Sequence, residues 1–529
     1  MSLGNTKDQG NKGNNFPYQL RNLQLLAAIQ ECCASSGLSL DEVIALLTTI
    51  SGDTAKLDVA LSTRNAEATQ LLVKNLLTTI DADTSNLDVA LSSRLADATF
   101  TSRINTLGQK TSALSTPVVL PSDQVVNVNV TANPMATDSF GRMRVSNPLT
   151  LFDSSHRYRD NGLWNTLGTI GGTAVFSPNE GLVNLNVTST GSSQVIRETA
   201  KVFSYQPGKS LLVFNTFVMA PAQPQLRQRV GYYGIDNGIY IQLRDDILSF
   251  VERSIVTGSP TETIVPQAVW NVDTLDGNGP SGITLDITKA QILFMDIEWL
   301  GEGTVRVGFV IDGVFILCHR FNHANLITST YITTASLPLR YEITNEGTAT
   351  AATLKQVCST VISEGGYELR GAQQAVGTPI LSPRTFAVAG TFYPIVGIRL
   401  QATRLDAIVI LTAVSLLGLG NGKNYAWRIL NGTQIIGGAW TPAAADSSVE
   451  CNLTGTSTTG GRVLAQGYIN SSNQGSPSMD ILKEALFASQ LERNTFTSTA
   501  YEIVVEMAVQ TTSGGEGAYA SVDWEEISR

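Results

Sequence analysis

The stretch TVRVGFVIDGVFILCHRF, residues 304–321, carries the clearest secondary-structure signal of the chain. Apolar residues alternate with polar or small ones over residues 304–311, Asp312-Gly313 favours a two-residue β-hairpin turn, and residues 314–321 form the returning strand. A turn of this length sets three pairs of facing residues: Ile311 with Val314, Phe309 with Ile316, and Val307 with Cys318. The face that carries these pairs is apolar, so we expect it to lie in a β core.

Short strands separated by turn residues continue on both sides of this hairpin, from about residue 147 to the end. This pattern is typical of β-sandwiches. We expect further strands at 211–218, 238–243, 292–299, 340–344, 395–401, 407–414, 426–430 and 501–509. Glycines at 365, 366 and 371 divide them into two β-sandwich (jelly-roll-like) domains, residues 148–371 and 372–529. One helix, Met479–Leu491, is expected to interrupt the second domain.

The N-terminal region is helical in pattern and contains an internal repeat of 30 residues. LLTTISGDTAKLDVALSTRNAEAT (46–69) recurs as LLTTIDADTSNLDVALSSRLADAT (76–99), with 17 of 24 positions identical. In each unit a polar break separates two helical pieces. The apolar stripe, for example Leu57, Ala60 and Leu61, is narrow, which favours a coiled-coil seam between chains. The alternative is a helical hairpin that packs on itself within one chain.

These patterns predict a mainly β protein with a helical N-terminal region. Residues 1–18 form an N-terminal arm, and 19–112 form a segmented helical stalk in which Ser39 caps a helix. Residues 113–147 form an extended linker, where Val126, Val128 and Val130 alternate with asparagines. The two β-sandwich domains follow.

Composition excludes several classes of function. The chain has 529 residues and a formal net charge of −10, with 15% charged residues and no basic run, so nucleic-acid binding is not expected. No segment reaches the roughly 18 apolar residues of a membrane span. The N-terminus lacks the apolar core of a secretory signal. Five cysteines without a metal-binding spacing fit free thiols in a cytoplasm, and no cofactor is expected.

One strand resembles the catalytic strand of jelly-roll glycoside hydrolases, in which alternate acids share the cleft. It reads FMDIEW, residues 294–299, and has Phe294 where the nucleophile would stand. The favoured interpretation is an ordinary sandwich strand with two exposed acids, ahead of a lectin-like face and of hydrolysis. We take Asp296, Glu298 and Trp299 as candidate glycan-binding residues, and we expect no catalytic residue. His319 lies on an expected strand and His323 follows four residues later, about 13 Å away in an extended chain, which is too far to share a metal ion unless the chain bends sharply after Phe321.

Three stretches resemble segments that recur in structural proteins of tailed bacteriophages. They are NTLGQK (105–110) with LSTPVV (114–119) and PSDQ (121–124), then DSFGRMRVSNPLTLFD (138–153), and the LDVALSTR repeats. The resemblance covers about residues 45–160. It implies a homotrimer, an N-terminal region docked on other virion proteins, and outer domains directed at a partner or host surface. It carries over no catalytic residue.

The sequence therefore predicts a non-enzymatic structural protein of a phage particle, a fibre or spike that is assembled in the host cytoplasm and contacts a host-surface glycan. Two other functions remain open. One is an architectural capsid, neck or baseplate component without a receptor. The other is a glycan-active β-sandwich, which requires Asp296 and Glu298 to line an open groove with a third carboxylate nearby.

Overall fold

The computed structural model describes residues 147–368, 370–471 and 489–528, and in the N-terminal region residues 31, 37, 39, 41, 42, 44–46, 48–53, 71–82 and 84. The chain divides into two units, residues 1–125 and residues 126–529. The predicted arm 1–18, nearly all of the predicted linker 113–147, most of the predicted stalk and most of the expected helix Met479–Leu491 lie outside the described residues.

The described part of the first unit is helical between residues 41 and 53 and between 71 and 82. The predicted cap at Ser39 is confirmed. The Glu42 carboxylate accepts a hydrogen bond of 2.8 Å from the Ser39 backbone N–H, and the Ser39 hydroxyl accepts one of 3.4 Å from Glu42 N–H, which is a capping box. Apolar side chains of both helical stretches are exposed, among them Leu46 (67%), Leu72 (69%) and Ile80 (50%). These two helical stretches alone do not establish the predicted segmented stalk.

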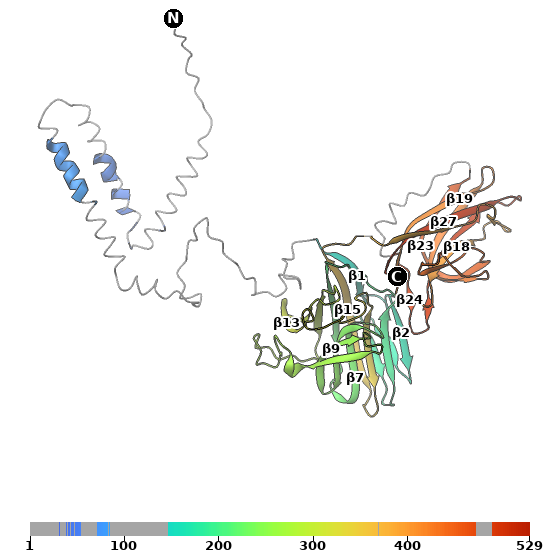
Figure 1. The fold of residues 1–529 in the computed structure, drawn as a ribbon, viewed down its shortest axis with the longest axis horizontal. Helices are drawn as coiled ribbons and strands as arrows, with labels where there is room; N and C mark the ends of the chain where they lie inside the picture. Colours follow the sequence, from blue (N-terminus) through green and yellow to red (C-terminus); the bar gives the residue numbers. More distant parts are fainter. Residues whose placement is uncertain are drawn as a thin grey trace, which may run out of the picture. The chain divides into compact units, whose positions relative to one another are not determined.

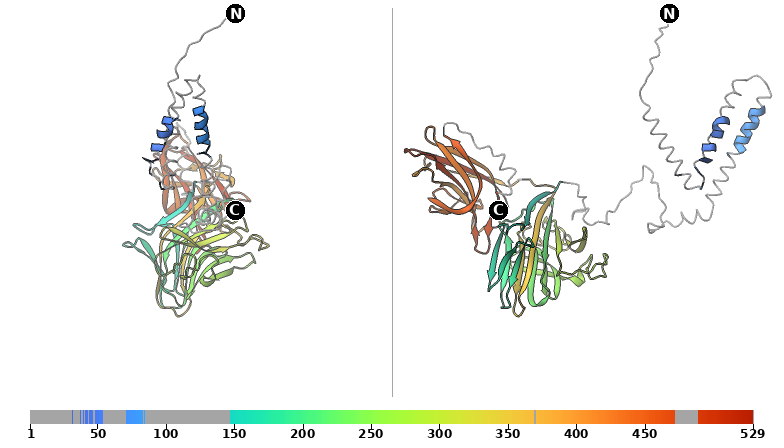
Figure 2. Two further views of the ribbon diagram at one scale, coloured as in Figure 1. Left: turned by 90° about the vertical axis from the view of Figure 1, so that its left-hand side faces the viewer. Right: turned by 180° about the vertical axis from the view of Figure 1, so that it is seen from behind.

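The predicted mainly β character of the remainder is confirmed. Residues 147–368 form an antiparallel pair of sheets (Figure 1; Figure 2 gives two other views). The strands are β1 (Leu149–Ser155), β2 (Trp164–Thr169), β3 (Thr173–Ser177), β4 (Leu182–Val187), β5 (Gln194–Thr199), β6 (Ser210–Val218), β7 (Gln223–Tyr233), β8 (Gly238–Asp245), β9 (Ile247–Ser254), β10 (Thr261–Pro266), β11 (Gln291–Ile297), β12 (Val305–Ile311), β13 (Val314–Phe321), β14 (Leu339–Asn345) and β15 (Ala352–Glu364).

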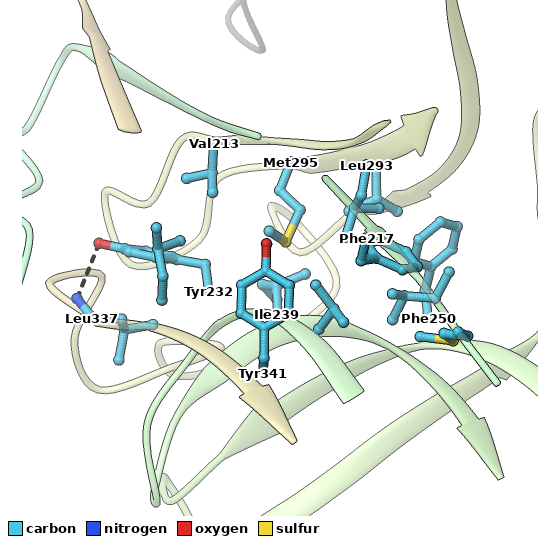
Figure 3. Packing of buried hydrophobic residues seen from close by; sticks show 14 of the residues in the cluster. Val213, Phe217, Tyr232, Ile239, Phe250, Leu293, Met295, Leu337 and Tyr341 are labelled. Atoms are coloured by element: carbon cyan, nitrogen blue, oxygen red, sulfur yellow. Dashed lines mark hydrogen bonds between the residues drawn. The ribbon is translucent and has the colours of Figure 1, made fainter. Parts of the chain in front are cut away.

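One sheet has the order β13-β12-β11-β6-β15-β4-β3, with β1 also paired to β15, and the other has the order β10-β9-β8-β7-β14-β5-β2. Side chains from both sheets meet in a single core, which makes this region a sandwich. Figure 3 shows Phe217 and Met295 of the first sheet facing Ile239 and Tyr341 of the second. The buried Tyr232 hydroxyl accepts a hydrogen bond from Leu337 N–H at 3.0 Å, so this polar group inside the core is satisfied.

Residues 370–471 and 489–528 form a second sandwich, drawn in orange to red in Figure 1. One of its sheets has the order β16-β27-β17 with β19 also paired to β27, and the other has the order β21-β22-β18-β26-β20-β23. The strands are β16 (Ala372–Gly377), β17 (Arg384–Thr385), β18 (Tyr393–Leu400), β19 (Ile408–Gly418), β20 (Asn424–Ile436), β21 (Thr441–Pro442), β22 (Val449–Asn452), β23 (Ser457–Asn470), β24 (Arg493–Asn494), β25 (Thr499–Ala500), β26 (Glu502–Val509) and β27 (Gly517–Ser528).

The predicted hairpin is confirmed at its turn and is wrong at its far end. Asp312 and Gly313 both have positive φ, 49° and 75°, as the turn requires, and Ile311 faces Val314. Beyond Gly308 the register shifts, so that Val307 faces His319 and not Cys318. The extra residue forms a β-bulge, a local irregularity that strand alternation does not reveal.

Buried polar contacts join the strand pair β24–β25 to the first sandwich. The Arg493 guanidinium lies 3.0 Å from the Glu198 carboxylate, and each of the two side chains is 1% exposed. Asn165 donates a hydrogen bond of 2.7 Å to the backbone carbonyl of Arg493. Arg493 also pairs with Asp406 and Glu198 with Arg340, so removal of Arg493 or Glu198 would leave the other buried charge with one partner fewer, which is costly.

The three histidines are buried in different environments. His319 accepts a hydrogen bond of 3.2 Å from Asn271 N–H at Nδ1, and burial lowers its pKa to about 4. The pKa of His156 is also lowered to about 4, mainly by burial and then by Arg197. Burial opposes a charge on His323 as well, but its 2.7 Å contact with Glu252 raises its pKa. Two of the three histidines are therefore neutral in the fold.

Acid is expected to destabilise the first sandwich through His319 and His156. Both have folded pKa values below the unfolded value of 6.5, so the unfolded chain takes up protons first and stability falls as the pH drops from about 6.5 towards 4. His319→Asn keeps an acceptor near the position of Nδ1 and does not titrate. Between pH 7 and pH 5 its Tm should fall a few degrees less than that of the natural protein.

His323 has the opposite effect on stability, because its pKa is raised in the folded protein. Its protonated form stabilises the fold below the unfolded pKa, and this stabilisation is lost as the pH rises through the folded pKa. The quantity to measure is therefore the difference in Tm between His319→Asn and the natural chain at each pH, by thermal unfolding. Equal losses of Tm in the two proteins would contradict the assignment of His319 as a buried neutral base.

Candidate functional site

The strand that carries Asp296 does not line an open groove. Asp296 lies on β11 and is 0% exposed, Glu298 is 1% exposed, and Phe294 is 0% exposed. The Nε of Arg306, on the neighbouring strand β12, donates a hydrogen bond of 2.9 Å to Asp296, and the Ser210 hydroxyl donates another. The expectation of exposed acids on this strand is wrong, because its outer face is covered.

Trp299 is also engaged within the fold. Its indole Nε1 donates a hydrogen bond of 3.0 Å to the backbone carbonyl of Ile332, and its ring meets Tyr205 edge to face at 6.1 Å. These contacts explain Trp299 as a packing residue. A glycan-binding role of Asp296, Glu298 and Trp299 stays a prediction, and their burial gives it no support.

A different region of the first sandwich is hollowed and polar. It lies on the outer face of the sheet β10-β9-β8-β7-β14-β5-β2 and encloses about 440 Å³. We call it the arginine depression, and nine residues line it: Gln194, Arg227, Arg229, Ile235, Arg244, Arg253, Glu262, Arg340 and Glu342.

Strand alternation brings these side chains to one face. Along β7, Arg229 alternates with the buried core residue Val230, and along β14, Glu342 alternates with Tyr341. The register places Arg229 directly opposite Glu342. Residues that face each other on adjacent strands lie within side-chain contact, so β7 and β14 together form the floor of the depression.

Glu342 is the anchor of the arginine depression. Its carboxylate lies 3.1 Å from Arg227, 3.5 Å from Arg340 and 3.9 Å from Arg229, and its side chain is 4% exposed. Burial alone would raise the pKa of Glu342, but Arg340, Arg229 and Arg227 outweigh burial and lower it. Glu342 is therefore ionised and fixes three guanidinium groups from one side.

Two tyrosines support the arginines from below. The rings of Tyr233 and Tyr240 lie 4.4 Å apart, with Arg340 5.4 Å from the first and Arg229 5.4 Å from the second. Gly231 makes this packing possible, since a Cβ there would lie 2.5 Å from the Cβ of Tyr240. These cation–π contacts hold the guanidinium planes in position and favour a preorganised surface.

The arginine depression is positive within an acidic chain. Five arginines and two glutamates line it, a difference of three positive charges, whereas the whole chain carries −10. The buried Glu198 pairs with Arg340, and Glu346 pairs with Arg227 and Arg244, and counting both glutamates still leaves one positive charge in the arginine depression. The local field therefore favours an anion.

The arginines also have hydrogen-bonding capacity that the fold does not use. The buried Nε atoms of Arg227, Arg253 and Arg340 have no hydrogen-bond partner among the described residues. A guanidinium has five N–H donors, and buried donors without an acceptor cost free energy. These Nε atoms are closed to solvent, so an oxygen-rich anion or water would supply acceptors to them only after the side chains move.

A second hollow of about 600 Å³ adjoins the first and shares Gln194 and Arg244 with it. It is lined by uncharged hydrogen-bonding side chains and a few charged ones: Ser192, Gln194, Gln225, Arg244, Asp245, Thr344, Asn345 and Glu346. The two hollows adjoin through the shared Gln194 and Arg244 and together form one polar track. Amides and hydroxyls of this kind bind hydroxyl-rich molecules.

Sequence patterns alone did not predict the residues of the two hollows as a site. A signal exists in the alternation of arginines with core residues, as in Leu226-Arg227-Gln228-Arg229-Val230 and Leu339-Arg340-Tyr341-Glu342-Ile343. Such alternation predicts one charged sheet face, but it does not reveal which strands are neighbours. Among the described residues, no group of histidine, cysteine and acidic side chains could hold a metal ion.

No model of a known protein family matches the sequence, and no curated protein matches it. Solved structures with similar parts include a protein of unknown function from Shewanella oneidensis MR-1, with a TM-score of 0.28, 10% identity, and coverage of 42% of this chain and 90% of that chain. Another is a legume lectin-like domain from Entamoeba histolytica, with a TM-score of 0.25, 12% identity, and coverage of 41% and 97%.

A third is the CBM2 module of an evolved Dit protein of Lactobacillus casei BL23 phage J-1, with a TM-score of 0.27, 8% identity, and coverage of 42% of this chain and 98% of that chain. At these TM-scores and identities the likenesses carry no argument about what this chain binds. Within the described residues, no helix is long and apolar enough to span a membrane.

Proposed function

We propose that this chain is a structural protein of a tailed-bacteriophage particle, a fibre or spike that binds an acidic saccharide on the host surface through the arginine depression. The observation that carries the binding part is the set of five guanidinium groups in one depression, three of them held by Glu342, with the Arg244 side chain 51% exposed. Carboxylates and phosphates match the donor geometry of arginine.

A saccharide suits the surroundings of the arginines better than a small inorganic anion does. The adjoining hollow presents the amides of Gln194 and Gln225 to sugar hydroxyls, whereas the Asn345 amide is buried and bonded within the fold. Two hollows of about 440 and 600 Å³ in sequence have room for an extended ligand.

The sequence alone supports the assignment of this chain to a phage particle. The segments 105–124 and 138–153 and the 30-residue repeat resemble phage structural proteins, and the chain has no basic run that would favour nucleic acid. Its N-terminal region docks on other virion proteins in this account, and the protein is assembled into the virion in the host cytoplasm. Each binding site is weak alone and gains avidity when several copies engage one surface.

We infer that the chain is a homotrimer joined through its helical region. Support comes from exposed apolar residues in both described helical stretches, including Leu46, Leu72 and Ile80. Apolar side chains on a narrow helical face are stabilised when partner helices cover them. The burial of Asp296 and Glu298 favours a binding role without catalysis, since a glycosidase needs both carboxylates in contact with the sugar.

The ligand is tested with the full chain on an array of saccharides that bear carboxylate, phosphate or sulfate groups, each beside its neutral parent. Binding is expected on acidic members, and it should weaken as salt is raised because the charges lie near the surface. Arg253→Gln should weaken it about tenfold, since a charge-assisted hydrogen bond contributes roughly 1.5–3 kcal/mol. Arg244→Gln, at a side chain 51% exposed, should act in the same direction.

Arg320→Gln is the matched control, because Arg320 is an exposed arginine on β13 of the opposite sheet. It removes the same charge and should leave binding unchanged. Thermal unfolding of each variant separates loss of binding from loss of the fold. If no acidic saccharide binds, or if Arg253→Gln and Arg320→Gln behave alike, the arginine depression is a structural ion-pair network and the proposal fails.

Sedimentation of the full chain at micromolar concentration tests the trimer. The expected mass is about three times the 56.5 kDa of the chain. The double variant Leu76→Asp with Ile80→Asp places charges on exposed apolar helical positions and should yield monomers. Leu381→Asp, at a residue 92% exposed in the second sandwich, should remain a trimer. A natural chain that sediments as a monomer would refute the trimer.

A further inference from the structure

The second sandwich carries a separate hollow of about 610 Å³ on the outer face of the sheet that contains β20. Strand β20 lies between β23 and β26, and the register places Ala426 beside Tyr468 on one side and Ala508 on the other. The intervening residues Tyr425 and Val509 point into the core. The two alanines therefore form a flat floor on the outer face.

Two aromatic side chains bound this floor. Tyr468 is 87% exposed, and Phe392 lines the hollow with one ring face covered by the guanidinium of Arg428, 4.1 Å away. An exposed tyrosine beside a flat apolar floor presents a ring to which the C–H face of a flat ligand can pack. We call this surface the tyrosine–amide platform.

A row of three amides closes one end of the platform. Asn470 Nδ2 donates a hydrogen bond of 2.6 Å to Asn424 Oδ1, and Asn424 Nδ2 donates one of 2.8 Å to Gln510 Oε1. Each amide has two N–H donors and an oxygen with two lone pairs. Asn424 therefore keeps one donor and one acceptor position beyond this row, and Gln510 is exposed.

The lining of the platform is uncharged, in contrast to the arginine depression. It consists of Gly390, Phe392, Asn424, Tyr425, Ala426, Tyr468, Ile469, Asn470, Ala508, Val509 and Gln510. An uncharged, concave surface with one exposed ring and a few oriented amides fits a molecule that has an apolar flat face and hydroxyl groups at its edge. A neutral hexopyranose has both, whereas an apolar peptide leaves the amides unpaired.

We propose that the tyrosine–amide platform is a second ligand site and binds a neutral hexopyranose unit of a glycan. The C–H face of the sugar packs on the Tyr468 ring above Ala426, and two adjacent hydroxyls pair with the amides of Asn424 and Gln510. The site is independent of the arginine depression and requires no charge on the ligand.

The test uses the full chain and neutral oligosaccharides of glucose, galactose, mannose and N-acetylglucosamine, with binding followed by saturation-transfer NMR and calorimetry. At least one of them should bind with little dependence on salt. Tyr468→Ala should weaken that binding about tenfold or more through loss of the ring contact. Asn424→Ala should weaken it less, while binding of acidic saccharides stays at the level of the natural protein.

Tyr158→Ala is the matched control, since Tyr158 is 81% exposed in the first sandwich and its removal should change nothing. The proposal is overturned if none of the neutral oligosaccharides binds, or if Tyr468→Ala and Tyr158→Ala have the same effect. It is also overturned if Tyr468→Ala changes the sedimenting mass, because the platform would then be a contact between copies. Arg253→Gln should weaken binding of acidic saccharides only, and Tyr468→Ala should weaken binding of neutral ones only. The two variants therefore test the two proposed sites separately.

Discussion

The buried carboxylate of Glu342 is the constraint on which the outer face of the first sandwich depends. A carboxylate that is 4% exposed on its side chain must be paired, and removal of one partner from a buried pair costs about 3–5 kcal/mol. Three arginines from β7 and β14 meet this demand and are thereby fixed in place. Glu342 uses only part of their donors, and the remaining ones favour an anionic ligand.

Both candidate sites arise because alternate residues of a strand point to opposite faces of its sheet. In each sandwich one set of alternate residues fills a core shared by two sheets, and the other set lies on an outer face. On β7 and β14 the outer set is charged, which results in the arginine depression. On β20, β23 and β26 the outer set is small, aromatic and amide-bearing, which results in the tyrosine–amide platform. The two surfaces therefore differ in ligand chemistry while sharing one architecture.

Local patterns in the sequence predicted ten of the described strands and the helix cap at Ser39, because these depend on residues close in the chain. The turn at Asp312-Gly313 and the helix start at Ser39 are examples. The arginine depression could not be predicted this way, since Arg253 on β9 and Glu342 on β14 become neighbours only through the order of strands in the sheet. Asp296 was expected to be exposed because alternation does not tell which outer face is covered, here by Arg306.

The central claim is that guanidinium groups fixed by Glu342 bind an acidic saccharide. The most direct measurement is an experimental structure of the full chain with the acidic saccharide that binds it most tightly. The account predicts that the charged group of the ligand lies within hydrogen-bonding distance of Arg253 or Arg244, with sugar hydroxyls along the hollow that contains Gln194 and Gln225. A ligand bound elsewhere, with the arginine depression unoccupied, would contradict the account.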